Sequence, residues 1–488
     1  MKKTFLYIAL GAAMFQSTSC YKDSLEPVPT NQISDQFAFD TKDRIEGQVR
    51  SIYASMKNGG MFGGRYQIYN DVRGADFQNL RTNVVTNFDI WNYTPSNSSA
   101  NSVLALWSRA YFVINLCNVF VDGMAAKGTA VVGETLSNTY LGEARLVRAM
   151  SYYALLQLYA RPFWDGNGSK PGVPLRLTGN TQQSDYALAR SSVSEVYAQI
   201  LADLDFAEAN LPLTNANATL NSTRGHRNTA IAFKTRVFLT MQRYPDVVTE
   251  ADKIVSPTAP FVATTGVPHA LQPDITTVFR TPFVSNESIL SMPFSSVETP
   301  GTQNQLGYYY GYPTSSGGNG GNAEYSLLGT GIVSNPAWTA ADKRRTMTAT
   351  VGTRIYLTKY AVASTFTDFA PVMRYSEILL NLAEAITRST NTVDQRAVDL
   401  LNAVRGRSDA AAVYSAGSFA DAAALADAIL LERRIELLGE GFGGVDLTRL
   451  GLPLPPKPGV TPVQPTGQQY IWPISSDELL LNSLMTDN

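Results

Sequence analysis

The sequence predicts a mainly α-helical protein, in which tetratricopeptide-like helical hairpins form a scaffold and long irregular loops carry the candidate binding surface. Apolar residues recur at helical spacing over much of the chain, and the helical stretches come in neighbouring pairs with short connectors. Two long segments rich in Gly, Ser, Asn, Pro and Tyr show no such stripe. Since no strict 34-residue period is present, the repeat assignment rests on the hairpins.

The first nineteen residues have the pattern of an export signal. Lys2 and Lys3 precede an apolar core from Phe5 to Phe15, which is shorter than the roughly 20 residues that a membrane-spanning helix needs. Cys20 follows small residues in an arrangement that resembles the lipobox of bacterial lipoproteins, although Ser17 stands where an aliphatic residue is usual. We expect cleavage before Cys20 and its acylation, for example with palmitate, because several acyl chains anchor durably. The alternative is an ordinary signal peptide followed by a free thiol.

The remainder of the chain is expected to form one domain behind a short tether. The polar tether covers 20–35 and the domain 36–488, and no later stretch is expected to span a membrane. A proline-rich arm begins at Pro453, and the segment "YIWPIS" after it is expected to dock back on the body. The helical scaffold is predicted mainly in 36–58, 101–255 and 372–440, and the loop-rich ligand regions at about 59–100 and 256–371.

Individual helices are predicted from apolar stripes and capping signals. Ser192 with Glu195 and Thr392 with Gln395 have capping-box spacing. Trp107 is expected in the core. The first stripe consists of Ile45, Val49, Ile52, Tyr53 and Met56. The predicted pairs are Ser102–Val121 with Glu134–Tyr159, Thr229–Met241 with Asp246–Val255, and Val372–Arg388 with Val393–Arg405. Helical ion pairs are expected for Arg374 with Glu377 and for Glu384 with Arg388.

Composition and missing motifs exclude several classes of function. With 39 basic and 41 acidic residues, the chain has no basic field for nucleic acid. Cys117 is the only cysteine besides Cys20, so no disulfide framework is expected. The only histidines, His226 and His269, stand in unrelated sequence settings, and neither HExxH nor GxSxG is present. We therefore expect no enzymatic activity, no cofactor and no metal site.

Seven segments spread over nearly the whole mature chain follow the order of one family's characteristic segments. They are "GEARLVRAMSYYALLQLYARPF", "GVPLRL", "RSSVSEVYAQILADLDFAEANLP", "PVMRYSEILLNLAEAI", "LNAVRGRS", "LERRIELLGEGFGGVDLTRLG" and "YIWPISSDEL". Through these segments the chain resembles the SusD/RagB family, the outer-membrane nutrient-binding lipoproteins of Bacteroidetes-type bacteria. Ala160 departs from the family's usual glycine, and Gly443 and Gly444 lie where arginine is frequent.

The resemblance implies a role in nutrient uptake at the cell surface. It implies a lipid-anchored protein, exposed on the outer membrane, that caps a SusC-like TonB-dependent transporter and captures oligosaccharides or, in some members, peptides. Cys20 would be the acylated tether. Alternatives to glycan capture are peptide capture and, third, a secreted glycan-degrading enzyme that uses a carboxylate pair such as Asp71 and Asp76.

The candidate ligand residues are aromatic and polar side chains of the two loop regions. A sugar presents flat C–H faces and hydroxyl groups, so a capture site needs aromatic planes with polar side chains at their edges. We expect Trp91 and the cluster around Tyr308 to form the main platform. The first region offers Tyr66, Tyr69, Arg73, Asp76, Arg81, Trp91, Tyr93 and Asn97, and the second offers Tyr308, Tyr309, Tyr310, Tyr312 and Trp338.

Overall fold

A computed structural model describes residues 37–182 and 184–488 of the chain. The predicted signal 1–19, the tether and Cys20 lie outside the described residues. The helices are α3 (Lys42–Met56), α4 (Arg65–Val72), α5 (Phe88–Trp91), α6 (Val103–Gly123), α7 (Thr129–Val132), α8 (Glu134–Tyr159), α9 (Val193–Asn210), α10 (Ala218–Thr223), α11 (Arg227–Thr240), α12 (Tyr244–Ala251), α13 (Leu306–Tyr310), α14 (Tyr375–Thr390), α15 (Gln395–Ser408), α16 (Ala422–Glu436), α17 (Gly443–Arg449) and α18 (Ser476–Leu481). The strands are β1 (Phe77–Asn79), β2 (Ser288–Met292), β3 (Tyr325–Leu327), β4 (Thr348–Val351), β5 (Arg354–Leu357) and β6 (Ala370–Arg374).

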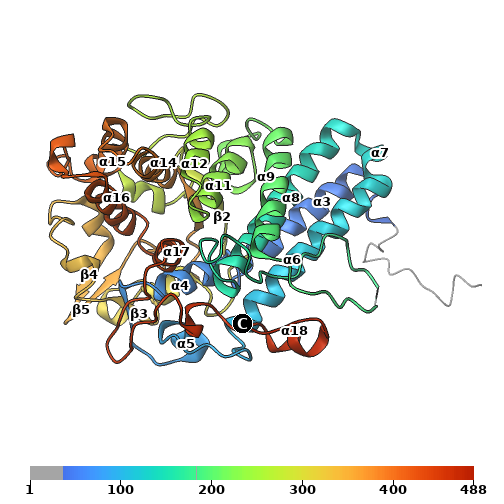
Figure 1. The fold of residues 1–488 in the computed structure, drawn as a ribbon, viewed down its shortest axis with the longest axis horizontal. Coiled ribbons are helices and arrows are strands. Elements are labelled where there is room, and N and C mark those ends of the chain that lie inside the picture. The colour runs from blue at the N-terminus through green and yellow to red at the C-terminus, as the bar shows by residue number, and fades with distance from the viewer. Residues whose placement is uncertain (1–36, 183) are drawn as a thin grey trace, which may run out of the picture.

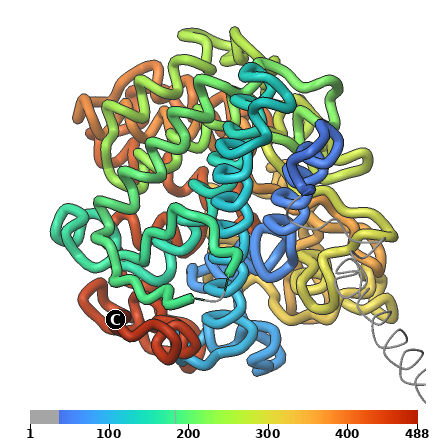
Figure 2. Tube along the Cα trace, turned by 90° about the vertical axis from the view of Figure 1, so that its right-hand side faces the viewer, coloured from blue at the N-terminus to red at the C-terminus, as the bar shows by residue number. Residues whose placement is uncertain are grey.

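The long helices form a stack that runs across the upper half of the molecule (Figure 1). Each packs against its neighbours in sequence: α6 on α8, α8 on α9, α9 on α11, α11 on α12, α12 on α14, and α14 on α15 and α16. The second view shows the same upper layer edge-on, with the long connections below it (Figure 2). Because each hairpin packs against the next hairpin along the stack, this arrangement is that of a helical repeat. The predicted mainly α fold with tetratricopeptide-like hairpins is confirmed.

Two features of the predicted helices appear as expected. Ser192 caps α9 in a complete capping box, in which its side chain accepts from the Glu195 amide and the Glu195 carboxylate accepts from the Ser192 amide. Trp107 is buried in the core, where its ring packs against Tyr159. The cap predicted for α15 is wrong, because Asp394 occupies the N-cap position and its side chain accepts from the amides of Arg396 and Ala397.

The start of the predicted helix 372–388 is also wrong. Residues up to Arg374 belong to β6, which is buried along its whole length and pairs antiparallel with β2, and the helix begins at Tyr375. Arg374 and Glu377 therefore do not share a helix, and Glu377 binds Arg236 instead. A fully buried strand has no alternation of polar and apolar residues, so its sequence reads like the helix that follows it.

The two loop-rich regions contain more regular structure than their composition suggests. The region 59–100 holds α4, which is buried on every side and so has no polar face to create a stripe. The region 256–371 contributes α13 and most of a four-stranded antiparallel sheet with the order β1-β3-β5-β4. Figure 1 places this sheet below the helical stack, with β4 and β5 at one end.

The helical run that contains α6 is apolar enough to be mistaken for a membrane span. Val103–Val132 meets the length and composition of such a span, contrary to the sequence expectation, and half of its most apolar window is buried. α6 packs against α3 and α8, so the apolar run is explained by a core helix.

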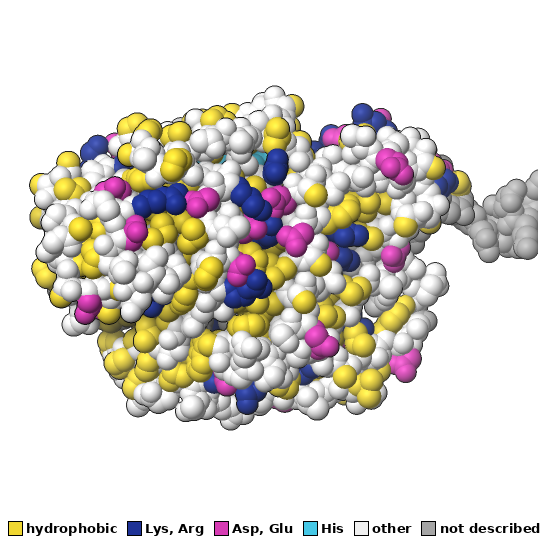
Figure 3. All heavy atoms as spheres, turned by 45° about the horizontal axis from the view of Figure 1, so that its top comes forward, with side chains coloured by type: hydrophobic (Ala, Val, Ile, Leu, Met, Phe, Trp, Pro, Cys, Tyr) yellow, Lys and Arg dark blue, Asp and Glu magenta, His cyan; other side chains and the backbone are white. Residues whose placement is uncertain are grey.

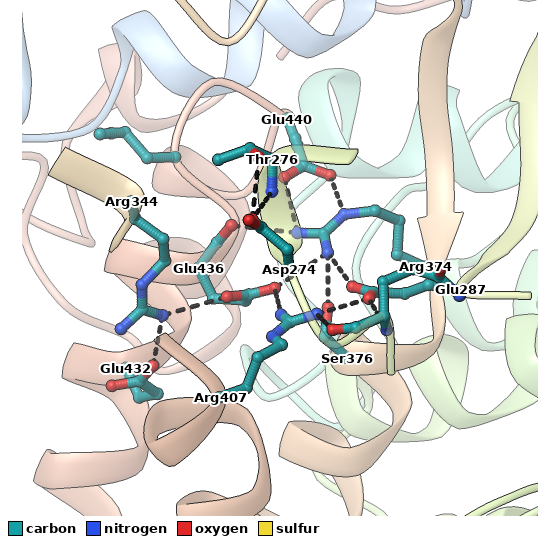
Figure 4. Close-up of polar contacts among 12 residues, drawn as sticks. Asp274, Thr276, Glu287, Arg344, Arg374, Ser376, Arg407, Glu432, Glu436 and Glu440 are labelled. Atoms are coloured by element: carbon teal, nitrogen blue, oxygen red, sulfur yellow. Dashed lines mark hydrogen bonds and ion pairs between the residues drawn. The ribbon is translucent and has the colours of Figure 1, made fainter. Parts of the chain in front are cut away.

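A buried network of ion pairs fastens the second loop region to the stack (Figure 4). Arg374 at the end of β6 donates to Glu287, to Glu436 on α16 and to Glu440 after it. Arg344 in the loop region also binds Glu436, at 3.0 Å. The ion pairs link the carboxylates Glu287, Asp342, Glu432, Glu436 and Glu440 with the cations Arg344, Lys359, Arg374, Arg405 and Arg407.

The proline-rich arm passes over the first loop region and then docks on the stack, as predicted. Tyr470 and Trp472 are buried, and the Trp472 amide donates to the Leu158 carbonyl on α8 at 2.7 Å. Lys457 of the arm binds the first loop region, because its buried ammonium donates to the carbonyls of Val72 and Trp91 at 2.6 and 2.8 Å. The C-terminal segment thus ties the first loop region to the helices.

Candidate ligand-binding face

The two loop regions meet along one continuous contact. β1 from the first pairs antiparallel with β3 from the second. Beyond the strands, the Arg81 guanidinium donates twice to the Asn322 carbonyl, at 3.0 and 2.8 Å, and the Thr86 hydroxyl donates to Glu324 at 2.6 Å. The Asn87 amide reaches the Tyr309 hydroxyl at 3.2 Å. The two loop regions therefore lie side by side, as predicted.

Most of the predicted aromatic platform lies beneath this contact. Trp91 is only 5% exposed, and its indole N–H donates to the Phe77 carbonyl at 2.8 Å. A ring buried to this extent cannot stack on a ligand unless the residues above it move. The other predicted rings that are buried are Tyr66, Tyr69, Tyr93, Tyr309, Tyr310 and Trp338.

The buried rings have protein partners that explain their burial. The Tyr69 hydroxyl donates to the Asn101 carbonyl at 2.7 Å, and the Tyr93 hydroxyl donates to the carbonyls of Arg73 and Pro455. Glycine-rich loops cannot form a core from their own small side chains, so their aromatic residues fold inward. The expectation that Trp91 and the whole Tyr308 cluster form an exposed platform is corrected accordingly.

Two of the predicted polar residues also serve the fold. Arg73 is buried and donates to the Tyr470 carbonyl at 2.6 Å. Asp76 is buried and accepts from Arg434 at 2.7 Å and from the Ile332 amide at 2.8 Å. These contacts join the first loop region to distant segments.

Asp71 and Asp76 do not form an open carboxylate pair. Asp71 accepts from the Tyr310 hydroxyl at 3.1 Å and from the amides of Gly441 and Gly443. Burial raises the pKa of Asp71 to about 7, against the lowering effect of these donors. Both carboxylates are occupied by donors from the protein.

The residues that remain accessible form a smaller patch at the meeting of the two regions. Arg81 is exposed, and Tyr308 and Tyr312 are half-buried. Arg81 and Tyr308 are joined through Asn322, whose carbonyl accepts from Arg81 and whose amide donates to the Tyr308 carbonyl at 2.9 Å. The Tyr312 ring packs against Tyr356 at a centroid distance of 5.1 Å. We call Arg81, Tyr308, Tyr312 and Asn322 the loop patch.

Sequence reasoning missed one residue of this patch and one half-buried ring of the first loop region, and it included one residue that lies elsewhere. The missed residues are Asn322 and the half-buried Phe88, whose ring stacks on Trp91 with centroids 5.9 Å apart. Phe88 precedes Trp91 in "FDIW", so its type and position could have indicated it. Asn97, in contrast, lies beside α18, where its carbonyl accepts from the Ser476 amide at 2.9 Å.

The structure brings the two histidines together. His226 and His269 are fully buried and stack with ring centroids 5.2 Å apart, although they come from unrelated sequence settings. Burial lowers the pKa of His226 to about 3 and that of His269 to about 4, so both are neutral in the fold. Within 37–182 and 184–488, no group of three or more His, Cys, Asp or Glu residues could hold a metal ion.

The face of the molecule in Figure 3 shows no large field of one sign. On the face in Figure 3, Lys and Arg side chains are interspersed with Asp and Glu, and apolar atoms appear between them. This pattern agrees with the near balance of 39 basic and 41 acidic residues.

The class of protein that has this stack of helical hairpins, with long loops on one side, is identified by comparison with known families and structures. Residues 25–239 match the family described as "Starch-binding associating with outer membrane", and residues 303–454 match the "SusD family". SusD-like protein P2 of Formosa agariphila is 25% identical over 95% of each chain. A SusD superfamily protein from Bacteroides fragilis is 31% identical, covers 92% of this chain and 100% of its own, and superposes with a TM-score of 0.80.

The fold is shared with more distant proteins as well. A SusD superfamily protein from Bacteroides thetaiotaomicron is 21% identical, covers 92% of this chain and 99% of its own, and also reaches a TM-score of 0.80. The chain belongs to the SusD/RagB family.

Proposed function

We propose that this chain is a surface-exposed outer-membrane lipoprotein that captures oligosaccharides and delivers them to a SusC-like TonB-dependent transporter without transforming them. Support comes from the matched family description, which names starch binding and association with the outer membrane. A surface glycan-binding protein from Bacteroides uniformis has the same fold, with a TM-score of 0.73 at 20% identity.

The observation that carries the proposal is the loop patch. Two half-buried tyrosines, Tyr308 and Tyr312, lie in the segment that Asn322 joins through backbone hydrogen bonds to the exposed side chain of Arg81. Aromatic rings with polar groups nearby are the combination that binds the C–H faces and hydroxyl groups of a saccharide. Arg81 is central, because its exposed guanidinium can donate to ligand hydroxyls at the edge of these rings. We propose Arg81, Tyr308, Tyr312 and Asn322 as the contact residues.

Calorimetry of the mature chain with a panel of oligosaccharides and peptides tests this function. For the oligosaccharide that binds, Arg81→Ala should weaken affinity about tenfold, since a hydrogen bond from a charged donor is worth roughly 1.5 kcal/mol or more. Arg50→Ala is the matched control, because Arg50 is exposed on α3 and should leave affinity unchanged. Binding of peptides alone, or release of shorter sugars during incubation, would contradict the proposal.

We further propose that Cys20 carries the lipid anchor after removal of residues 1–19. In the native host, labelled palmitate should enter the wild-type chain and should fail to enter Cys20→Ser. The same membranes, solubilised in mild detergent, should yield a TonB-dependent barrel together with the wild-type chain. Incorporation of label into Cys20→Ser would refute acylation at this residue, and recovery of the chain without any barrel would refute the partnership.

A further inference from the structure

A leucine-lined pocket lies between α16 and α17, outside the loop patch. On α16 it is lined at positions i, i+3, i+4 and i+7 by Asp427, Leu430, Leu431 and Arg434. On α17 and the residue after it, the same spacing presents Gly443, Asp446, Leu447 and Leu450. These spacings place each set on one helical face, so the two faces form opposite walls. Ala75, Asp76 and Leu452 complete the lining.

The pocket is apolar in the middle and charged at two ends of one wall. Its volume is about 240 Å³, just below the range typical of drug-sized ligands. The leucines on α16 and α17 are half-buried, and Leu452 is 43% exposed. Seven residues separate Asp427 from Arg434, which corresponds to about 10 Å along the helix.

Both charged ends of the pocket have polar groups that can bind a ligand. The Arg434 side chain is 38% exposed and gives its Nε and Nη2 to Asp76, at 3.3 and 2.7 Å. Among the described residues, none accepts from its Nη1 and none donates to the exposed Asp427 carboxylate. Asp446, in contrast, is occupied by Arg433 and Arg449.

We propose that this pocket binds a short apolar peptide of about three residues, with its amino terminus at Asp427 and its carboxylate at Arg434. An extended chain spans about 3.3–3.6 Å per residue, so three residues match the roughly 10 Å between the charged ends. The peptide's aliphatic side chains lie against the leucines.

Other small ligands fit this chemistry less well. A saccharide would lose hydration of its hydroxyl groups against leucines that offer no hydrogen bond, which is unfavourable. A fatty acid could reach Arg434 but has no donor for Asp427. The peptide uses both ends and the apolar centre.

The experiment uses trileucine with free termini as the probe and the mature chain labelled at its leucine methyl groups. Methyl spectra should shift at Leu430, Leu431, Leu447 and Leu450. Trileucine should bind more tightly than dileucine, and acetylation of its amino terminus should weaken binding about two- to fivefold, as expected for a partly exposed ion pair.

Asp427→Asn supplies the decisive variant, because an exposed side chain can change without unfolding the protein. It should weaken trileucine binding by the same factor and abolish the effect of acetylation. Asp399→Asn, an exposed aspartate on α15, is the matched control and should bind like wild type. No methyl shift at millimolar trileucine, equal affinity for the acetylated peptide, or stronger shifts with decanoate or an oligosaccharide would overturn the proposal. Since the loop patch does not line this pocket, these results are independent of glycan capture.

Discussion

Replacing Arg374 by methionine should destabilise the protein strongly. Arg374 is 1% exposed and donates to Glu287 at 2.5 Å, to Glu436 at 2.9 Å and to Glu440 at 2.7 and 2.8 Å. Methionine keeps much of the volume but removes all of these donors. Three buried carboxylates would lose a shared cation, and the contact between β6 and α16 would lose its main polar link.

The magnitude follows from the burial and balance of the network. Its five carboxylates and five cations compensate one another, so removal of one cation leaves an excess buried negative charge. Burial would raise the pKa of Glu436, but Arg407, Arg374 and Arg344 together lower it well below its usual range. Breaking a buried pair on one side costs about 3–5 kcal/mol, and we expect at least this loss.

Urea unfolding followed by circular dichroism measures the effect. Arg50→Met is the matched control, because Arg50 pairs with Glu46 on the surface of α3 and should cost less than about 1 kcal/mol. Adding Glu440→Gln to Arg374→Met should recover part of the loss, since it removes one uncompensated charge. A loss below 1 kcal/mol for Arg374→Met alone would refute the reasoning that this network fastens the loops to the stack.

Three further changes test the contacts around the loops and the stack. Asp71 has a pKa of about 7 in the folded protein against about 3.8 in the unfolded chain, so its stabilising contribution is present at low pH and lost as pH rises. Between pH 5 and 8 the free energy of unfolding of the wild type should fall by about 2–3 kcal/mol relative to that of Asp71→Asn, and parallel pH profiles of the two proteins would contradict this. Lys457→Met leaves two buried carbonyls without a donor and should cost about 1–3 kcal/mol with faster hydrogen exchange in the arm, whereas a more stable variant would mean that burial of the ammonium outweighs its bonds. Ser192→Ala removes the cap of α9 and should cost about 1 kcal/mol in urea unfolding. Ser194→Ala, two residues further on in the first turn of α9, should cost less, and equal losses would argue against the capping box.

Helical periodicity was sufficient to predict the scaffold. The pairs α6 with α8, α11 with α12, and α14 with α15 follow from local stripes and short connectors, because each helix buries one face. The strand β6 was mistaken for helix since all five of its residues are buried. Local patterns therefore predict amphipathic helices well and fully buried elements poorly.

The candidate site could be predicted only in part, because burial depends on contacts between distant segments. The two loop regions were expected to meet, and the pairing of β1 with β3 joins them. Nothing local distinguishes Tyr308, which stays half-exposed, from Tyr309, which is buried, although they are adjacent. The ion-pair partners of Arg374 could not be predicted for the same reason, since Glu287 lies 87 residues away in sequence.

Hydrogen exchange of the mature chain with and without a bound oligosaccharide tests glycan capture most directly. If the loop patch is the capture site, protection on binding should concentrate in residues 79–88 and 303–323, with the helical stack unchanged and the sugar recovered intact. Protection confined to the helices, or the absence of binding by every oligosaccharide in a broad panel, would contradict the account.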